Sequence, residues 1–278
     1  MTEKGVHIEG VDYYTLTERP QSGNGHPERH VLLAHALMSN LHMYDQTVKA
    51  LTNAGFTTIR FDHIGHNNTP APSSNASYHM DDLTRHMHQL VEATTGQKHL
   101  HAVIGCSIGG VLALRYAMLY PGNVEKVISI AAPGIVTPEP SKALWSQRIE
   151  QFEEDSRSGG SVLCHATVNR WFPGERAEDD SVRAEALSHV KTCSLAGYKM
   201  LADTIRDYDY GDEVRGIRDV KCLVVAGSED SAVSPGLLKD VASRIVGAEF
   251  VRMEGAGHLP PMHKVEELNG MMLAFLEG

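Results

Sequence analysis

A serine between two glycines is the first place where this sequence could do chemistry. Residues 103–111 read VIGCSIGGV, with Ser107 two positions after Gly105 and two before Gly109. A hydroxyl that attacks a carbonyl carbon must be exposed, with a base beside it and hydrogen-bond donors near the oxyanion that forms. A tight turn between a strand and a helix supplies the exposure and the donors, and it leaves room only for small residues at the two glycine positions. The spacing therefore predicts that Ser107 is a nucleophile.

Cys106 is a second possible nucleophile, directly beside the serine. A turn centred on Cys106 would place Ile104 and Ile108 at the two positions that require small residues. The sequence therefore favours Ser107, and we expect Cys106 to be a small packing residue. The other cysteines are widely spaced and form no CxxC pair, so we expect free, buried thiols at Cys164, Cys193 and Cys222.

A base and an acid are expected after two buried strands near the end of the chain. SEDSAVS follows the apolar run CLVVAG, and GAGHLPP follows FVRME, which places Asp230 and His258 just past two apolar runs. The carboxyl ends of parallel strands meet at one edge of a sheet, where ligand chemistry collects. We predict that Asp230 is the acid and His258 the base, in the chain order serine, acid, histidine. Glu229 stays an alternative acid, and we expect His263 at the start of the last helix.

The loop after the first parallel strand should supply the second donor for the oxyanion. This loop reads AHALMSN, and we expect the backbone N–H groups of Leu37 and Ile108 to form the oxyanion hole. His35 and Ser39 lie in the same loop. The sequence leaves open whether these two side chains have a structural or a catalytic role.

The elements that must position these residues alternate between strand and helix. Apolar or β-branched runs predict strands at 30–36, 57–62, 100–105, 126–132, 221–227 and 248–254. Amphipathic patterns predict helices at 43–54, 80–95, 107–119, 235–245 and 263–276. An antiparallel pair is expected within residues 5–19. This alternation is typical of βαβ units, so we expect a mostly parallel central sheet with helices on both faces.

Residues 137–212 interrupt the alternation, because this segment opens with prolines and continues as helical patterns. We predict a core domain of residues 1–136 and 213–278, with 137–212 inserted as a helical cap. Position along the chain makes the following residues candidate substrate contacts: Met38, Ile135, Val136, Arg170, Trp171 and Phe172. Arg170 could bind a substrate carboxylate through two hydrogen bonds, or form a surface salt bridge instead.

Composition narrows the classes of partner. The net charge is −10, and Lys and Arg form no run, so we expect a small-molecule ligand rather than nucleic acid or an anionic membrane. The start of the chain has no signal-peptide pattern, and no apolar run has the length of a membrane helix, so we expect a cytoplasmic protein. The sixteen histidines include no HExxH motif, and we expect neither a metal nor another cofactor. The oligomeric state stays open, with a homodimer as one option.

Together these segments resemble the α/β-hydrolase fold superfamily across essentially the whole chain. The resemblance rests on HAL in the first loop, FDHIGHNNT, GCSIGG, VVAGSEDSAV and GAGHLPP. Ala36 and Asn67 stand where many members have glycine. Asparagine tolerates the left-handed backbone better than most residues, so we expect the turn at Asn67 to be kept.

Within that superfamily, residues 41–45, 170–172 and 196–209 are similar to the 3-oxoadipate enol-lactonase group, which hydrolyses a small enol-lactone ring. The resemblance implies a serine hydrolase that cleaves a small carboxylic ester or lactone through an acyl-enzyme. The same residues could instead serve C–C bond hydrolysis, acyl transfer or perhydrolysis. A further alternative is a slow, ligand-sensing hydrolase or receptor.

Overall fold

One mixed sheet forms the centre of the molecule. A computed structural model of the chain describes residues 1–21, 28–73, 76–137, 139–174 and 176–278. Within these ranges, eight strands form one sheet in the order β1-β2-β4-β3-β5-β6-β7-β8. The strands are β1 (Thr2–Ile8), β2 (Val11–Glu18), β3 (Arg29–Ala34), β4 (Phe56–Phe61), β5 (Leu100–Cys106), β6 (Val124–Ile130), β7 (Lys221–Gly227) and β8 (Glu249–Met253). β2 pairs antiparallel with β1 and β4, and the other neighbours are parallel, as the sequence predicts.

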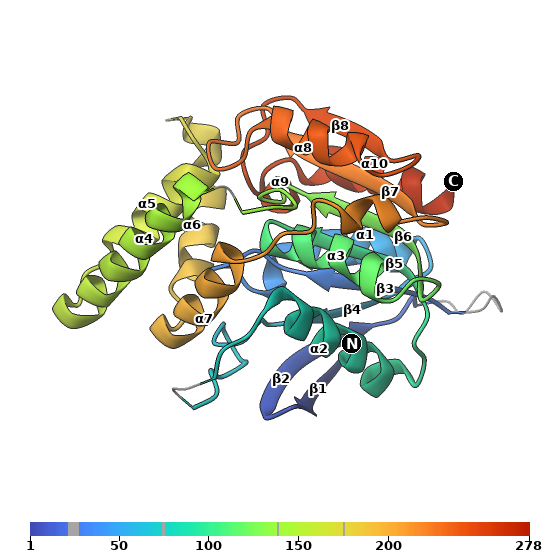
Figure 1. The fold of residues 1–278 in the computed structure, drawn as a ribbon, viewed down its shortest axis with the longest axis horizontal. Coiled ribbons are helices and arrows are strands. Elements are labelled where there is room, and N and C mark those ends of the chain that lie inside the picture. The colour runs from blue at the N-terminus through green and yellow to red at the C-terminus, as the bar shows by residue number, and fades with distance from the viewer. Residues whose placement is uncertain (22–27, 74–75, 138, 175) are drawn as a thin grey trace.

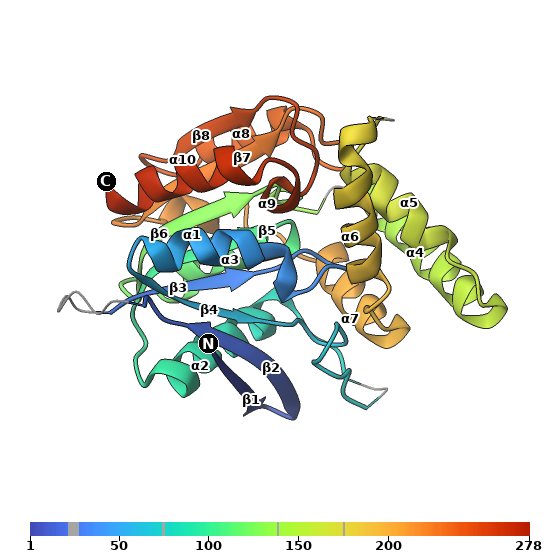
Figure 2. The same cartoon turned by 180° about the vertical axis from the view of Figure 1, so that it is seen from behind.

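Helices cover both faces of this sheet. α2 (Met80–Thr95), α3 (Ile108–Leu119) and α8 (Pro235–Ser243) lie on the face turned to the viewer in Figure 1. α1 (Asp45–Asn53) and α10 (Val265–Glu277) lie on the opposite face, which Figure 2 presents. The central strands are buried on both sides: every residue of β5 after His101 is buried. The predicted elements are all present, with ends displaced by about two residues at most, except that β1 begins three residues before the predicted antiparallel pair.

In the described part of the chain, four α-helices come between β6 and β7. They are α4 (Glu139–Ser158), α5 (Val162–Trp171), α6 (Asp180–Val190) and α7 (Leu195–Arg206). Figures 1 and 2 show them together at one side of the molecule, beyond the carboxyl ends of the parallel strands. The described residues of 137–212 contain no strand, in agreement with the helical patterns. The division of the chain into a core and a cap stays a prediction.

Backbone contacts join this helical insertion to the sheet. Its two ends run side by side, because the Thr137 N–H donates to the Tyr208 carbonyl at 3.1 Å and the Tyr210 N–H donates to the Ile135 carbonyl at 2.8 Å. At a second point, a Cβ added to Gly65 would lie 2.2 Å from the Cα of Gly197 in the first turn of α7. Only glycine allows so close an approach at both positions. The insertion is therefore fixed to the core at more than its two ends.

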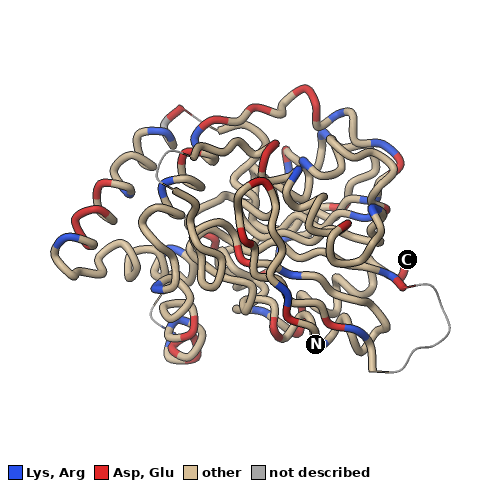
Figure 3. The backbone as a smooth tube through the Cα atoms, turned by 90° about the horizontal axis from the view of Figure 1, so that it is seen from below, with Lys and Arg blue, Asp and Glu red and all other residues tan. Residues whose placement is uncertain are grey.

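Charged residues are distributed over the whole molecule. Figure 3 shows Lys and Arg interspersed with Asp and Glu along the chain. In the described part of the chain, no helix is both long enough and apolar enough to cross a membrane.

The end of the chain differs from the prediction in one detail. A short helix, α9 (Pro260–His263), precedes α10, so His263 ends a separate helix rather than beginning the last one. Lys264 between the two helices has φ −128° and ψ 55°, which is outside the helical region and separates them.

Candidate active site

Ser107 lies in the tight turn between β5 and α3. Its backbone has φ 57° and ψ −120°, a conformation that residues other than glycine rarely adopt. A Cβ added to Gly105 would lie 1.8 Å from the Gly109 carbonyl oxygen, and one added to Gly109 would lie 2.1 Å from the Ala34 carbonyl oxygen. Both glycine positions therefore exclude any larger residue, which is the steric reason for the GxSxG spacing.

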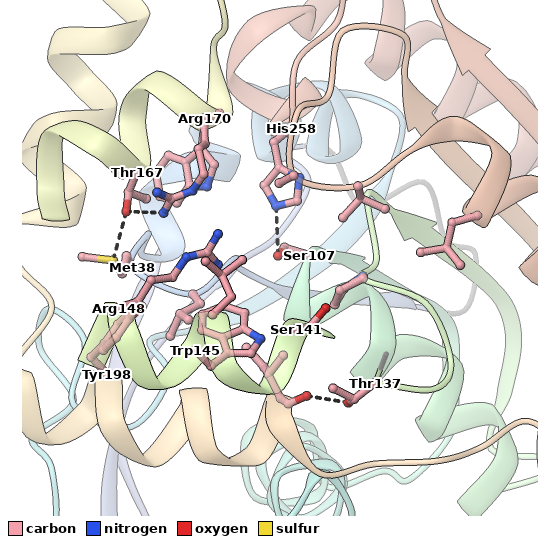
Figure 4. Close-up of a pocket in the computed structure, with 18 of the residues that line it drawn as sticks. Met38, Ser107, Thr137, Ser141, Trp145, Arg148, Thr167, Arg170, Tyr198 and His258 are labelled. Carbon is pink, nitrogen blue, oxygen red and sulfur yellow. Dashed lines mark hydrogen bonds between the residues drawn. The ribbon is translucent and has the colours of Figure 1, made fainter. Parts of the chain in front are cut away.

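The structure brings Ser107, His258 and Asp230 into one chain of hydrogen bonds. The Oγ of Ser107 lies 3.1 Å from Nε2 of His258, and Nδ1 of His258 lies 2.8 Å from Oδ2 of Asp230 (Figure 4 shows the first of these contacts). The other oxygen of Asp230 accepts hydrogen bonds from the N–H groups of Ala232, at 2.7 Å, and Val233, at 2.9 Å. Because the carboxylate accepts the proton on Nδ1, Nε2 is free to accept the proton of the serine hydroxyl.

Glu229, the alternative acid, lies elsewhere. Its carboxylate pairs with Arg176 at 2.9 Å and is 40% exposed, whereas the side chain of Asp230 is fully buried. His263 does not contact Ser107 in the described structure, but it supports the loop of His258. Its Nδ1 accepts a hydrogen bond from the Gly257 N–H at 2.9 Å, and its Nε2 donates to Asp179 at 3.0 Å.

Cys106 is fully buried beside the serine. Its thiol lies 3.7 Å from the carbonyl oxygen of His258, and burial raises its pKa well above the usual range. A buried, protonated thiol is a poor nucleophile. All four cysteines are free and buried, as the spacing of these residues predicts.

Two backbone N–H groups near Ser107 are available for an oxyanion. No hydrogen bond among the described residues uses the N–H of Leu37 or of Ile108. The neighbouring N–H of Met38 instead donates to Nε2 of His66 at 3.0 Å. Met38 has φ 65°, so the loop changes direction directly after Leu37. The prediction that Leu37 and Ile108 form an oxyanion hole agrees with this geometry and stays a prediction.

Three buried histidines support this loop. Nε2 of His35 accepts from the His63 N–H at 2.8 Å, and Nε2 of His63 donates back to the His35 carbonyl at 2.9 Å. Nδ1 of His66 donates to the Ile64 carbonyl at 2.9 Å, which leaves its Nε2 as the acceptor for Met38. Burial lowers the pKa of all three, to about 3 for His63 and about 4 for His66, so the rings are neutral near pH 7. His35, whose role the sequence left open, thus joins the backbone of this loop, at the Ala36 carbonyl, to that of the loop after β4, at the His63 N–H.

The turn at Asn67 follows the expectation, since its φ is 45° and its N–H donates to the Thr192 carbonyl at 3.1 Å. Ser39, the other open position, lies 3.4 Å from Nδ1 of His189. Among the described residues, no group of three or more His, Cys, Asp or Glu side chains could hold a metal ion.

A cavity lies over Ser107 and His258, between the sheet and the helical insertion. Of the predicted substrate contacts, Met38, Arg170 and Trp171 line this cavity (Figure 4 labels the first two). Three others do not line it, and we withdraw them: Ile135, Val136 and Phe172. Phe172 is fully buried against His263, and Val136 is 38% exposed and bridges to Asp209.

Several residues that line the cavity were not predicted from the sequence. The helices of the insertion contribute Ser141, Trp145, Arg148, Thr167 and Tyr198. Trp145 and Arg148 are three residues apart and therefore share one face of α4. That spacing was the available signal, but the sequence did not indicate which face of α4 turns toward Ser107.

Comparisons with known proteins place the chain in a family. The model of the alpha/beta hydrolase fold family matches residues 29–265. Lipase 1 of Psychrobacter immobilis is 23% identical over 257 residues, which cover 88% of this chain and 76% of the lipase. Serine O-succinyltransferase of Litchfieldella anticariensis is 36% identical over 162 residues, or 48% of this chain and 44% of that enzyme. The chain belongs to the alpha/beta hydrolase fold family, which confirms the resemblance to that superfamily.

A solved structure gives the same fold over the full length. The crystal structure of the enol-lactonase from Burkholderia xenovorans LB400 matches with a TM-score of 0.85 and 23% sequence identity, and the match covers 99% of this chain and 100% of that one. At this identity the likeness is one of fold, which confirms the predicted architecture.

Proposed function

We propose that this chain is a serine hydrolase that cleaves small carboxylic esters or lactones through an acyl-enzyme on Ser107. The observation that carries the proposal is the hydrogen-bond chain from Ser107 through His258 to Asp230, at the floor of a cavity. Membership of the alpha/beta hydrolase fold family supports hydrolysis, and the likeness to a lipase and to an enol-lactonase supports an ester or lactone bond.

Acylation begins when His258 Nε2 accepts the hydroxyl proton as Oγ of Ser107 attacks the carbonyl carbon. Asp230 stabilises the imidazolium that forms. The N–H groups of Leu37 and Ile108 donate to the oxyanion of the tetrahedral intermediate. When this intermediate collapses, the bond to the alkoxy oxygen breaks and His258 gives its proton to that oxygen. A lactone keeps the released hydroxyl attached to the acyl group.

Deacylation repeats the sequence with water. His258 accepts a proton from a water molecule as the water oxygen attacks the acyl carbon. His258 then gives the proton to Oγ of Ser107, and the bond between Oγ and the acyl carbon breaks. The carboxylic acid leaves. The cavity above is lined largely by apolar and aromatic side chains, including Trp145, Trp171 and Tyr208, so it suits a small organic substrate.

Acyl transfer is the second candidate, because the identity to serine O-succinyltransferase is 36% over 162 residues. Both reactions pass through the same acyl-enzyme. They differ in whether water or an alcohol attacks the acyl carbon, so an added acceptor alcohol such as serine distinguishes them by its ester product.

A panel of short-chain esters and lactones tests the proposal, with acid release followed by titration at constant pH. We expect repeated turnover of at least one member without any metal or cofactor added. Two results would contradict the proposal. One is a folded protein that releases no acid from any member, and the other is release that stops after one equivalent, as for a ligand sensor.

A further inference from the structure

Two arginines point into the cavity that contains Ser107. Arg148 comes from α4 and Arg170 from α5, and Figure 4 shows both guanidinium groups on the same side of the cavity. Both side chains are partly buried. Among the described residues, no Asp or Glu lines this cavity, and the recorded contacts of the two arginines include no carboxylate.

Their present contacts use few of their hydrogen-bond donors. Nη2 of Arg170 donates to Oγ1 of Thr167 at 2.8 Å, and the guanidinium of Arg148 lies 4.8 Å from the centre of the Trp145 ring. Each guanidinium has five N–H donors in a planar fork. Burial and the charge of Arg148 lower the pKa of Arg170 to about 10, and burial also lowers the pKa of Arg148. Both groups remain positively charged near pH 7.

Other arginines of this chain contrast with this pair. Arg60 and Arg115, which are more deeply buried, form salt bridges with Glu18 and Asp81 at 3.0 and 2.7 Å. The chain has 35 acidic and 25 basic residues, so carboxylates are plentiful. Placing two like charges side by side in a partly buried cavity is costly unless an anion joins them. The cavity therefore lacks the counter-charge that a ligand would supply.

We propose that Arg148 and Arg170 form an anion subsite, which binds a free carboxylate of the substrate remote from the ester bond that Ser107 attacks. The substrates are then esters or lactones that carry one free carboxylate. Two guanidinium forks can bind both oxygens of a carboxylate, and Thr167 orients the fork of Arg170. The identity of the cleaved bond rests on the proposed function, whereas the binding of a carboxylate by the two arginines does not.

Matched substrates test the subsite. Monomethyl glutarate and methyl valerate differ by a carboxylate in place of a terminal methyl group, and 4-carboxyphenyl butyrate and 4-methylphenyl butyrate make the same comparison on the alcohol side. For each pair, the ratio of kcat/KM for the acid to that for the neutral ester is measured. We expect Arg148→Met and Arg170→Met to lower the ratio at least tenfold in one pair or both, and Arg→Lys variants to lower it less.

Arg157→Met is the matched control, because Arg157 is on α4 too but is 73% exposed and pairs with Glu154. It should keep the wild-type ratio. Melting curves check that the Met and Lys variants of Arg148 and Arg170 are folded. If the ratio stays within twofold of wild type in all four of these variants, the subsite is overturned while ester hydrolysis stands.

Binding of glutarate, followed by calorimetry, separates the subsite from the proposed function. We expect wild-type protein to bind glutarate, and Arg148→Met and Arg170→Met to weaken the affinity at least tenfold. If wild-type protein binds glutarate but hydrolyses none of the esters, the result supports the subsite and contradicts the proposed function. No binding of glutarate to wild type, together with no preference for the acidic esters, overturns the subsite.

Discussion

Ser107→Ala should lower kcat/KM for a chromogenic short-chain ester by about 10³-fold or more while the protein stays folded. The alanine removes the oxygen that attacks the carbonyl carbon, so no acyl-enzyme can form. The smaller side chain also removes the contact with His258, but no packing in the sheet depends on this hydroxyl. Initial rates over a range of substrate concentration give the loss, and circular dichroism with a melting curve checks the fold.

Cys106→Ala is the control for that variant, since it changes the adjacent residue at the same turn. Its thiol is buried and contacts only the backbone of His258 among the described hydrogen bonds, so most of the activity should remain. A Ser107→Ala protein that keeps more than a tenth of wild-type kcat/KM would contradict the assignment. So would a folded Cys106→Ala protein that loses nearly all turnover.

Asp230→Asn should have the next largest effect, with kcat/KM lower by about 10³-fold to 10⁴-fold. The amide of asparagine can donate a hydrogen bond to Nδ1 of His258, which favours the tautomer with its proton on Nε2. That proton then faces Oγ of Ser107, and the ring can no longer accept the serine proton. The amide oxygen can still accept from the N–H groups of Ala232 and Val233, so the loop should keep its conformation.

Glu229→Gln makes the same chemical change one residue earlier. Its carboxylate pairs with Arg176 at the surface, so kcat/KM should stay within about twofold of wild type. Initial rates of both variants are compared with the same ester. If Glu229→Gln loses activity and Asp230→Asn keeps it, the acid has been assigned to the wrong residue.

The turn at Ser107 was predictable because its requirements are local. The backbone of Gly105 approaches Gly109, and that of Gly109 approaches Ala34, so closely that only glycine fits. This requirement fixes the spacing of the glycines along the chain. The positions of Asp230 and His258 were predictable for a different reason, because residues that follow parallel strands meet at one edge of the sheet. The fold itself could be predicted from the alternation of strand and helix patterns.

The lining of the cavity was less predictable, because it depends on how the helical insertion packs against the sheet. Val136 directly follows the predicted contact Ile135, yet neither side chain lines the cavity, since nearness along the chain does not set the direction of a side chain. Arg148 lies in a helix with many charged residues, where a surface arginine has the same pattern. Only the three-dimensional arrangement brings it beside Arg170.

The most direct test of the account is to detect the acyl-enzyme itself. Wild-type protein is mixed with an excess of ester, quenched in acid at short times, and analysed by mass spectrometry of the intact chain and of its peptides. We predict a mass increase equal to that of the acyl group, located on Ser107 in the peptide that contains residues 103–111 and absent from Ser107→Ala. Turnover without any adduct on Ser107, or with an adduct on Cys106 or His258 instead, would contradict the account.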